Sequence, residues 1–201
     1  MNHHSVRGGD KRARILESAL KVFASKGFYA AKVADVAAEA GVADGTIYLY
    51  FKSKDDLLIS LFEEQMQQVN SQLTTALVGA ISATDKLQRF FKAYLGMVET
   101  HRHATEIITI ELRQSAKFMK DYANPRFAEF LKLLAGIIDE GQASGTFVSG
   151  TPPTVLARAI FGLLDELALM WVTTKGDKID IRKAADWVGR LVLEGLERRS
   201  A

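Results

Sequence analysis

The stretch that most constrains this chain is Val33–Phe51, which reads as two short helices joined by a tight turn. Ala37 is small enough to let two helices approach closely, and Gly41 can enter a left-handed turn at no steric cost. Ile47 and Phe51 follow at an i, i+4 spacing, which places both on the inward face of the second helix. This spacing predicts a helix-turn-helix.

The second of these helices has an outward face that carries Thr46, Tyr48 and Tyr50. A short helix that exposes hydroxyl and aromatic groups suits the major groove of DNA. Asp44 lies at the start of the helix, where we expect it to act as a cap rather than as a base contact. An ordinary helical hairpin needs the same packing residues, so the pattern alone leaves both readings open.

The distribution of charge favours a nucleic-acid partner for the N-terminal part. The net charge is +2, but residues 1–52 carry about +3 and the remaining residues about −1. A basic head on a near-neutral body fits DNA binding by the head. A solvated surface with uneven charge gives the same totals.

Composition excludes several classes of protein. The chain of 201 residues has no Cys, which fits the reducing cytoplasm and excludes thiol nucleophiles and thiolate metal sites. No secretory signal is visible, and the longest apolar stretch, residues 156–172, contains three charged residues, so we expect a buried helix rather than a membrane span. The four His have neither metal nor triad spacing, so no metal or cofactor is expected.

The apolar pattern is helical almost throughout, which predicts an all-α fold. We expect a three-helix DNA-binding domain over residues 1–52 and a ligand-binding and dimerisation domain over residues 53–201. Residues 1–9 are expected to form a loose arm before a helix capped by Asp10. Further helix starts are predicted at Ser53, at Asn124-Pro125 and at Thr151-Pro152.

The last two predicted helices, from Thr151-Pro152 and from Ile181, have wide apolar surfaces that need a partner. The same two helices of a second copy would complete a four-helix bundle with two-fold symmetry. A dimer would also match the two-fold symmetry of a palindromic operator. The alternative is that the body covers these surfaces internally.

The body also contains a surplus of Phe and Met side chains among embedded polar residues, which indicates a cavity for a hydrophobic ligand. For any single residue a place in the packed core is the simpler reading. The expected lining consists of Phe62, Met66, Phe90, Tyr94, Met97, Ile108, Leu112, Phe127, Leu131, Phe161, Leu164 and Trp171. The embedded polar residues are Glu111, Arg113, Gln114, Asp165 and Glu166.

The head resembles the tetracycline-repressor (TetR) family of bacterial transcriptional regulators. The residues that carry the resemblance are ILESALKVFASKGF and VADVAAEAGVADGTIYLYFKSKDDL, with the Y-x-Y-F-x-S-K-x-x-L ending. The resemblance implies about nine helices, a homodimer and a ligand pocket in the body. Three blocks in the head, at 110–115 (IELRQS) and at 160–172 (IFGLLDELALMWV) are similar to the fatty-acid-responsive branch, which binds long-chain acyl-CoA.

The resemblance places the DNA contacts on the second helix and on the cations around it. The expected DNA-binding residues are Lys32, Val33, Asp44, Gly45, Thr46, Tyr48, Tyr50, Lys52 and Lys54. Lys52 and Lys54 are expected to hold phosphate at the start of the long helix, and Lys32 to hold phosphate across the groove. Many family members have Thr-Thr at positions 31 and 32, whereas this chain has Ala31-Lys32, which leaves the cap of that helix open.

The resulting prediction is a cytoplasmic dimeric repressor of fatty-acid degradation genes that leaves a palindromic operator when long-chain acyl-CoA binds the body. Arg113 is expected either to pair with a CoA phosphate or to form a structural bridge with Asp165 or Glu166. The alternative function is a repressor of an efflux or other metabolic operon that responds to a different hydrophobic molecule. An enzyme based on a Glu111/Asp165 acid pair and an architectural DNA protein without a pocket are the readings from other classes.

Overall fold

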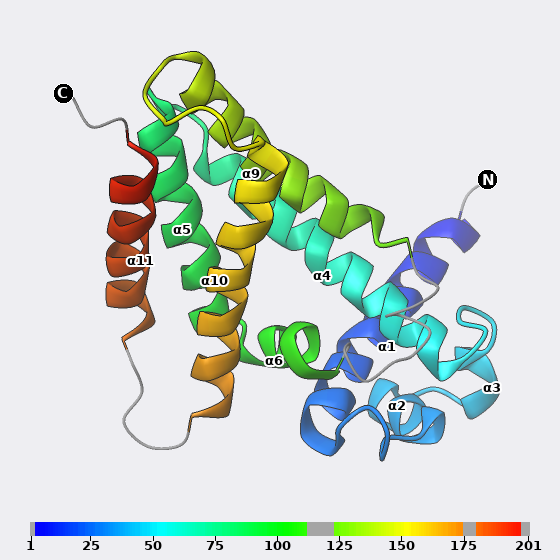
Figure 1. Cartoon of the computed structure of the whole chain (residues 1–201). Helices are drawn as coiled ribbons and strands as arrows, with labels where there is room; N and C mark the ends of the chain where they lie inside the picture. Colours follow the sequence, from blue (N-terminus) through cyan, green and yellow to red (C-terminus); the bar gives the residue numbers. More distant parts are fainter. Residues whose placement is uncertain (1–2, 112–122, 175–179, 198–201) are drawn as a thin grey trace. The chain divides into compact units, whose positions relative to one another are not determined.

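The computed structural model describes residues 3–111, 123–174 and 180–197, and over these residues the chain is almost entirely helical (Figure 1). The predicted all-α fold is confirmed there. The helices are α1 (His3–Lys26), α2 (Val33–Ala40), α3 (Asp44–Ile47), α4 (Lys54–Ala76), α5 (Ala83–Thr100), α6 (Arg102–Glu106), the π-helix η1 (Ile107–Glu111), α9 (Pro125–Ala143), α10 (Pro153–Thr173) and α11 (Ile181–Leu196). A search of the described residues finds no helix both long and apolar enough to cross a membrane.

The chain forms two compact units. The first unit comprises Met1–Gln65 with His103–Ala123, and the second comprises Met66–Arg102 with Asn124–Ala201. The predicted boundary at residues 52 and 53 does not coincide with this division, because the first half of α4 and the segment after α5 group with the head. Periodicity along a helix does not show which neighbours it packs on, so this grouping depends on tertiary contacts.

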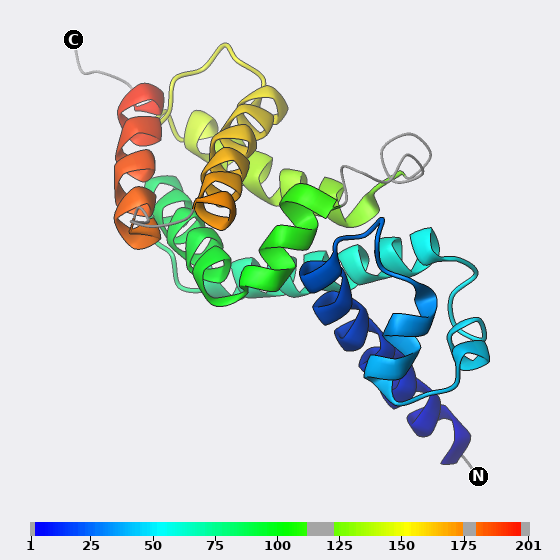
Figure 2. The same ribbon diagram turned by 90° about the horizontal axis from the view of Figure 1, so that it is seen from below.

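The first unit is built on the packing residues that the sequence pattern singled out. Ala37 is fully buried, and Ile47 and Phe51 are each 1% exposed. α1 packs against α2, and α2 against α3 (Figure 2). Phe28 lies in the loop after α1 and meets the Phe23 ring edge-on, with 5.5 Å between the ring centroids. The predicted helix-turn-helix core is therefore confirmed.

The second unit is a bundle in which α9 packs against α5 and α10, while α5 also packs against α11 (Figures 1 and 2). Its core contains Phe90, Phe91, Phe130 and Leu164, which have at most 1% of their surface exposed. After α9, the chain makes an isolated β-bridge between Phe147 and Glu197.

Two predicted helix starts are confirmed by capping hydrogen bonds. The Ser53 hydroxyl accepts the Asp56 backbone N–H at 3.1 Å, and the Asp56 carboxylate accepts the Lys52 N–H at 2.8 Å. These two hydrogen bonds hold the chain at the start of α4, where Ser53 is the capping residue. The Asn124 side chain accepts the Phe127 N–H at 3.2 Å, and Pro125 occupies the first helical position of α9.

Three other predicted starts are wrong. α1 begins at His3 rather than Asp10, so residues 3–9 are helical and not a loose arm. Asp44 is the first residue inside α3, and the capping position is Ala43, which has no side-chain bond to offer. α10 begins at Pro153, with Pro152 and not Thr151 at the capping position. Helix elongation is cooperative and either Pro suits a first turn, so a capping residue type alone does not locate the boundary.

Candidate nucleic-acid interface and effector site

The turn between α2 and α3 requires a glycine. Gly41 has φ of 64° and ψ of 40°, the left-handed region that residues with a Cβ enter at a cost. Its N–H donates to the Ala38 carbonyl at 3.2 Å, and the Val42 N–H donates to the Ala37 carbonyl at 3.0 Å. These bonds end α2 and redirect the chain into α3 within three residues.

The start of α2 is capped from inside the helix. The Asp35 carboxylate accepts the Lys32 N–H at 2.8 Å and the Lys26 ammonium at 2.8 Å. The hydrogen bond from Lys26, followed by that from Lys32, lowers the pKa of Asp35. Asp35 thus provides a side-chain bond at the start of α2, where Lys32 makes no side-chain capping bond. It also joins the end of α1 to the start of α2.

The outward face of α3 and its following turn is exposed as expected. Ile47 points into the core, whereas Tyr48 is 58% exposed, Asp44 and Gly45 are exposed, and Thr46 and Tyr50 are half-buried. A Cβ added at Gly45 would meet no atom within 4 Å, so internal packing does not require glycine there. Freedom from a packing role fits a position that a DNA backbone or base edge approaches closely.

Two further exposed side chains in the head were not predicted from the sequence. Leu49 is 80% exposed in the turn after α3, and Tyr29 is 68% exposed in the loop between α1 and α2. Helical spacing could have shown Leu49, which lies two positions from the buried Ile47 and therefore on a different face. The exposure of Tyr29 follows from the conformation of its loop, which no periodicity reveals.

The predicted cations fall into two groups. Lys32 and Lys52 are exposed, and within the described part of the chain neither ammonium group makes a hydrogen bond or an ion pair. Val33 lies beside Lys32, half-buried at the first position of α2. Lys54 differs, because its ammonium donates to backbone carbonyls within the head. Its predicted phosphate contact stays a prediction.

Four of the predicted effector residues gather around one phenylalanine in the second unit. Phe90, Tyr94, Phe127 and Phe161 all have ring centroids within 6.0 Å of the Phe130 centroid, and Phe127 and Phe161 meet at 4.6 Å. Phe130 itself is 1% exposed. Helices α5, α9 and α10 thus contribute one continuous aromatic cluster.

The other predicted effector residues are distributed more widely. In the second unit, Met66, Met97 and Leu164 are buried, and Leu131, Asp165 and Trp171 are half-buried. In the first unit, Phe62 is buried and Ile108 is half-buried. Leu112 and Arg113 lie outside the described residues. The lining as a set stays a prediction.

A groove of about 700 Å³ lies between α4, α5 and α9 in the second unit, and the predicted effector residues do not line it. Its walls include Asn70, Lys86, Glu129 and Ile137. The groove is therefore distinct from the aromatic cluster.

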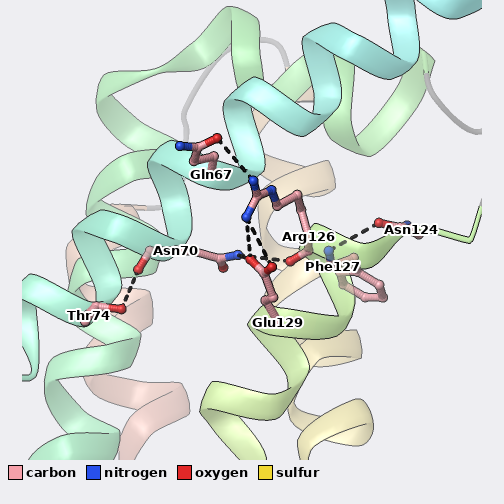
Figure 3. Close-up of polar contacts among 7 residues, drawn as sticks. All are labelled: Gln67, Asn70, Thr74, Asn124, Arg126, Phe127 and Glu129. Atoms are coloured by element: carbon pink, nitrogen blue, oxygen red, sulfur yellow. Dashed lines mark hydrogen bonds and ion pairs between the residues drawn. The ribbon is translucent and has the colours of Figure 1, made fainter.

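A polar cluster that the sequence reasoning missed joins α4 to the first turn of α9 (Figure 3). Asn70 donates through Nδ2 to the Arg126 carbonyl at 3.0 Å, and the Arg126 guanidinium reaches both Glu129 carboxylate oxygens at 3.1 and 3.0 Å. Arg126 also donates to Gln67 Oε1 at 3.5 Å. Glu129 offsets the unfavourable charge of an Arg beside a helix N-terminus.

A second arginine binds the C-terminal end of α10. Arg102 donates through Nη2 to the Val172 carbonyl at 2.7 Å, and its guanidinium carbon lies 5.3 Å from the Trp171 ring centroid. A cation at the C-terminal end of α10 complements the helix dipole. Arg102 Nη1 is buried and has no acceptor among the described residues.

With this geometry in place, sequence comparison defines the class of the protein. Residues 15–61 match the family model of bacterial regulatory proteins of the tetR family, and residues 62–195 match the model of the YsiA-like protein C-terminal region. The chain belongs to the tetR family and is a transcriptional regulator rather than an enzyme.

The particular relatives are regulators of fatty-acid metabolism. The fatty acid metabolism regulator protein of Bacillus subtilis is 32% identical over 94% of this chain and 97% of its own length. Among solved structures, FadR from Bacillus subtilis in complex with stearoyl-CoA has a TM-score of 0.85 and 33% identity, covering 91% of this chain and 98% of that chain. FadR from Bacillus halodurans, a fatty acid degradation regulator, has a TM-score of 0.83 and 32% identity, covering 92% and 99%.

Proposed function

We propose that this protein is a homodimeric repressor of fatty-acid degradation genes that binds a palindromic operator and leaves it when long-chain acyl-CoA binds the body. The observation that carries the proposal is the likeness over nearly the whole chain, at a TM-score of 0.85, to a regulator solved with stearoyl-CoA. Likeness of the body is what matters, since the helix-turn-helix alone is shared by regulators with unrelated effectors.

DNA binding is assigned to the outward face of α3 with the cations beside it. Tyr48 and Leu49 are exposed, while Ile47 packs into the core and holds the helix in place. The exposed side chains of this face therefore have no packing role and are available for contact with DNA. Lys32 and Lys52 present ammonium groups to solvent on either side of this face in the sequence, and we assign them to phosphates. No Arg or Asn on α3 offers a bidentate base contact, so DNA shape and thymine methyl groups carry much of the specificity.

The homodimer is assigned to α10 and α11. Val155 and Leu163 on α10 are 56% and 44% exposed, and Trp187 and Leu191 on α11 are 56% and 64% exposed. In each pair the spacing of four or eight residues puts the two side chains on one helix face. A two-fold axis through these faces would cover them and would set two heads on half-sites about 34–36 Å apart.

The effector is assigned to the body because a long acyl chain needs an apolar enclosure, and the cluster around Phe130 is the largest aromatic assembly in the described part of the second unit. The acyl-CoA acts only if it binds one body conformation better than another. A differential affinity of about 3–5 kcal/mol gives a usable switch. The same logic with another hydrophobic molecule describes the alternative, a repressor of an efflux or other metabolic operon.

Fluorescence anisotropy on a labelled fragment of the gene's own promoter tests the proposal. We expect sequence-specific binding that palmitoyl-CoA, stearoyl-CoA or oleoyl-CoA abolishes at micromolar concentrations, while free CoA and free palmitate leave it unchanged. Binding that is specific but indifferent to every acyl-CoA would retain the DNA-binding regulator and reject the effector. Binding without sequence preference would favour an architectural DNA protein.

A further inference from the structure

The Lys54 ammonium group is enclosed by the backbone of the loop between α1 and α2. It donates to the carbonyls of Phe28, Tyr29 and Ala31 at 2.8, 3.2 and 3.1 Å. A Lys ammonium has three donors, so these bonds use all of them. The same nitrogen lies 4.5 Å from the centroid of the Phe28 ring, where a cation is attracted by the ring's π electrons.

This arrangement ties together two parts of the head that are distant in sequence. Lys54 is the first residue of α4, whereas Phe28, Tyr29 and Ala31 lie at least 23 positions earlier. Phe28 and Ala31 are themselves buried, at 3% and 2% exposed. The loop is therefore held to the core on both sides of Tyr29. The loop leads directly into Lys32 and α2.

We propose that Lys54 is a positioning residue for DNA binding and not a phosphate contact. By drawing three carbonyls of residues 28–31 onto one nitrogen, it sets the path of the loop and so the place from which the exposed Tyr29 and Lys32 approach DNA. The positive charge of its ammonium group is compensated by three carbonyl oxygens within the head. A phosphate could bind this group only by displacing those oxygens. The inference rests on the proposed DNA binding and adds a residue that acts without touching the operator.

Substitution of Lys54 by Arg distinguishes a phosphate contact from a positioning role. At a phosphate contact, an Arg guanidinium serves as well as an ammonium, because its fork matches phosphate oxygens. In the Lys54 enclosure it fails, because its donors are splayed in a plane and do not converge from one nitrogen. Lys54→Arg, Lys54→Met and Lys54→Ala should therefore weaken operator binding alike, by about tenfold or more, since each loses charge-assisted hydrogen bonds.

Lys52 provides the matched control, since it lies two residues away with an ammonium group that makes no bond to the described residues. Lys52→Ala should reduce the slope of log affinity against log salt by about 0.9, the value for one phosphate contact. Each Lys54 variant should keep the wild-type slope while losing affinity. The titrations are run at 10 °C on protein whose circular dichroism matches the wild type, so that loss of folded protein does not contribute.

The outcomes distinguish this inference from the proposed function. If the wild type does not bind its promoter, the proposed function fails first. If the wild type binds and Lys54→Arg keeps its affinity, or if Lys54→Ala lowers the salt slope as Lys52→Ala does, the positioning role is overturned. If no Lys54 variant folds, a crystal structure of the wild-type operator complex decides. We expect Nζ to remain on the three carbonyls, and a phosphate oxygen in their place would contradict the inference.

Discussion

A double substitution on α11, Trp187→Glu with Leu191→Glu, is expected to convert the protein to a monomer and to lower operator affinity by about 10²–10⁴-fold, the gain that linking two binding modules provides. Both side chains are more than half exposed on one face of α11, and they are large and apolar. A two-fold axis would bring the four introduced carboxylates together in a desolvated interface, where like charges cannot be neutralised by neighbours. Size-exclusion chromatography with light scattering measures the mass, and anisotropy measures the affinity.

The control for this substitution is Ile81→Glu, because Ile81 is 91% exposed but lies between α4 and α5. It should leave the protein dimeric with unchanged operator binding. A dimer that survives the double substitution would place the interface on another surface, and a monomer that binds the operator as tightly as the wild type would remove the need for two-fold symmetry.

Two substitutions three residues apart are expected to affect different properties, the first stability and the second DNA binding. Phe51 is 1% exposed and lies beneath the Arg12 guanidinium at 5.4 Å, so Phe51→Ala should lower the free energy of unfolding by about 3–5 kcal/mol. Tyr48 is 58% exposed, so Tyr48→Ala should change stability by less than about 0.5 kcal/mol. It should nevertheless weaken operator binding by about tenfold, because a side chain at the base edges or phosphates is lost.

Urea unfolding followed by circular dichroism gives the stability of each variant, and anisotropy gives its affinity. Tyr29→Ala is a useful companion, because Tyr29 is also exposed but lies on the loop before α2. If Tyr48→Ala destabilised the protein and left the affinity of its folded fraction unchanged, α3 would be a packing element and the reading face would have to lie elsewhere.

Residues whose roles depend on local periodicity were predictable. Ala37, Gly41 and Ile47 occupy the inward and turn positions that their spacing indicates, because a short helix and its turn follow from contacts within a few residues. The caps at Ser53 and Asn124 are local in the same sense. The family resemblance was equally readable, since it rests on contiguous blocks of sequence.

Roles that depend on tertiary contacts were not predictable. Nothing near Lys54 in the sequence shows that three carbonyls 23 to 26 positions earlier converge on its ammonium group. The cluster of Asn70 with Arg126 likewise joins residues 56 positions apart. The central place of Phe130 among the other rings depends on how α5, α9 and α10 cross, so the pattern could assign it only to a helix core. The predicted capping role of Asp44 was wrong, because Ala43 occupies the capping position and Asp44 is already the first residue of α3.

Native mass spectrometry of the wild-type protein mixed with its operator and increasing stearoyl-CoA tests the central claim most directly, because it counts every molecule in each complex. We expect dimer–operator complexes to disappear as dimers with bound stearoyl-CoA appear, with no significant population that carries both. A stable ternary complex of dimer, operator and stearoyl-CoA, or the absence of any bound stearoyl-CoA at saturating concentration, would contradict the account.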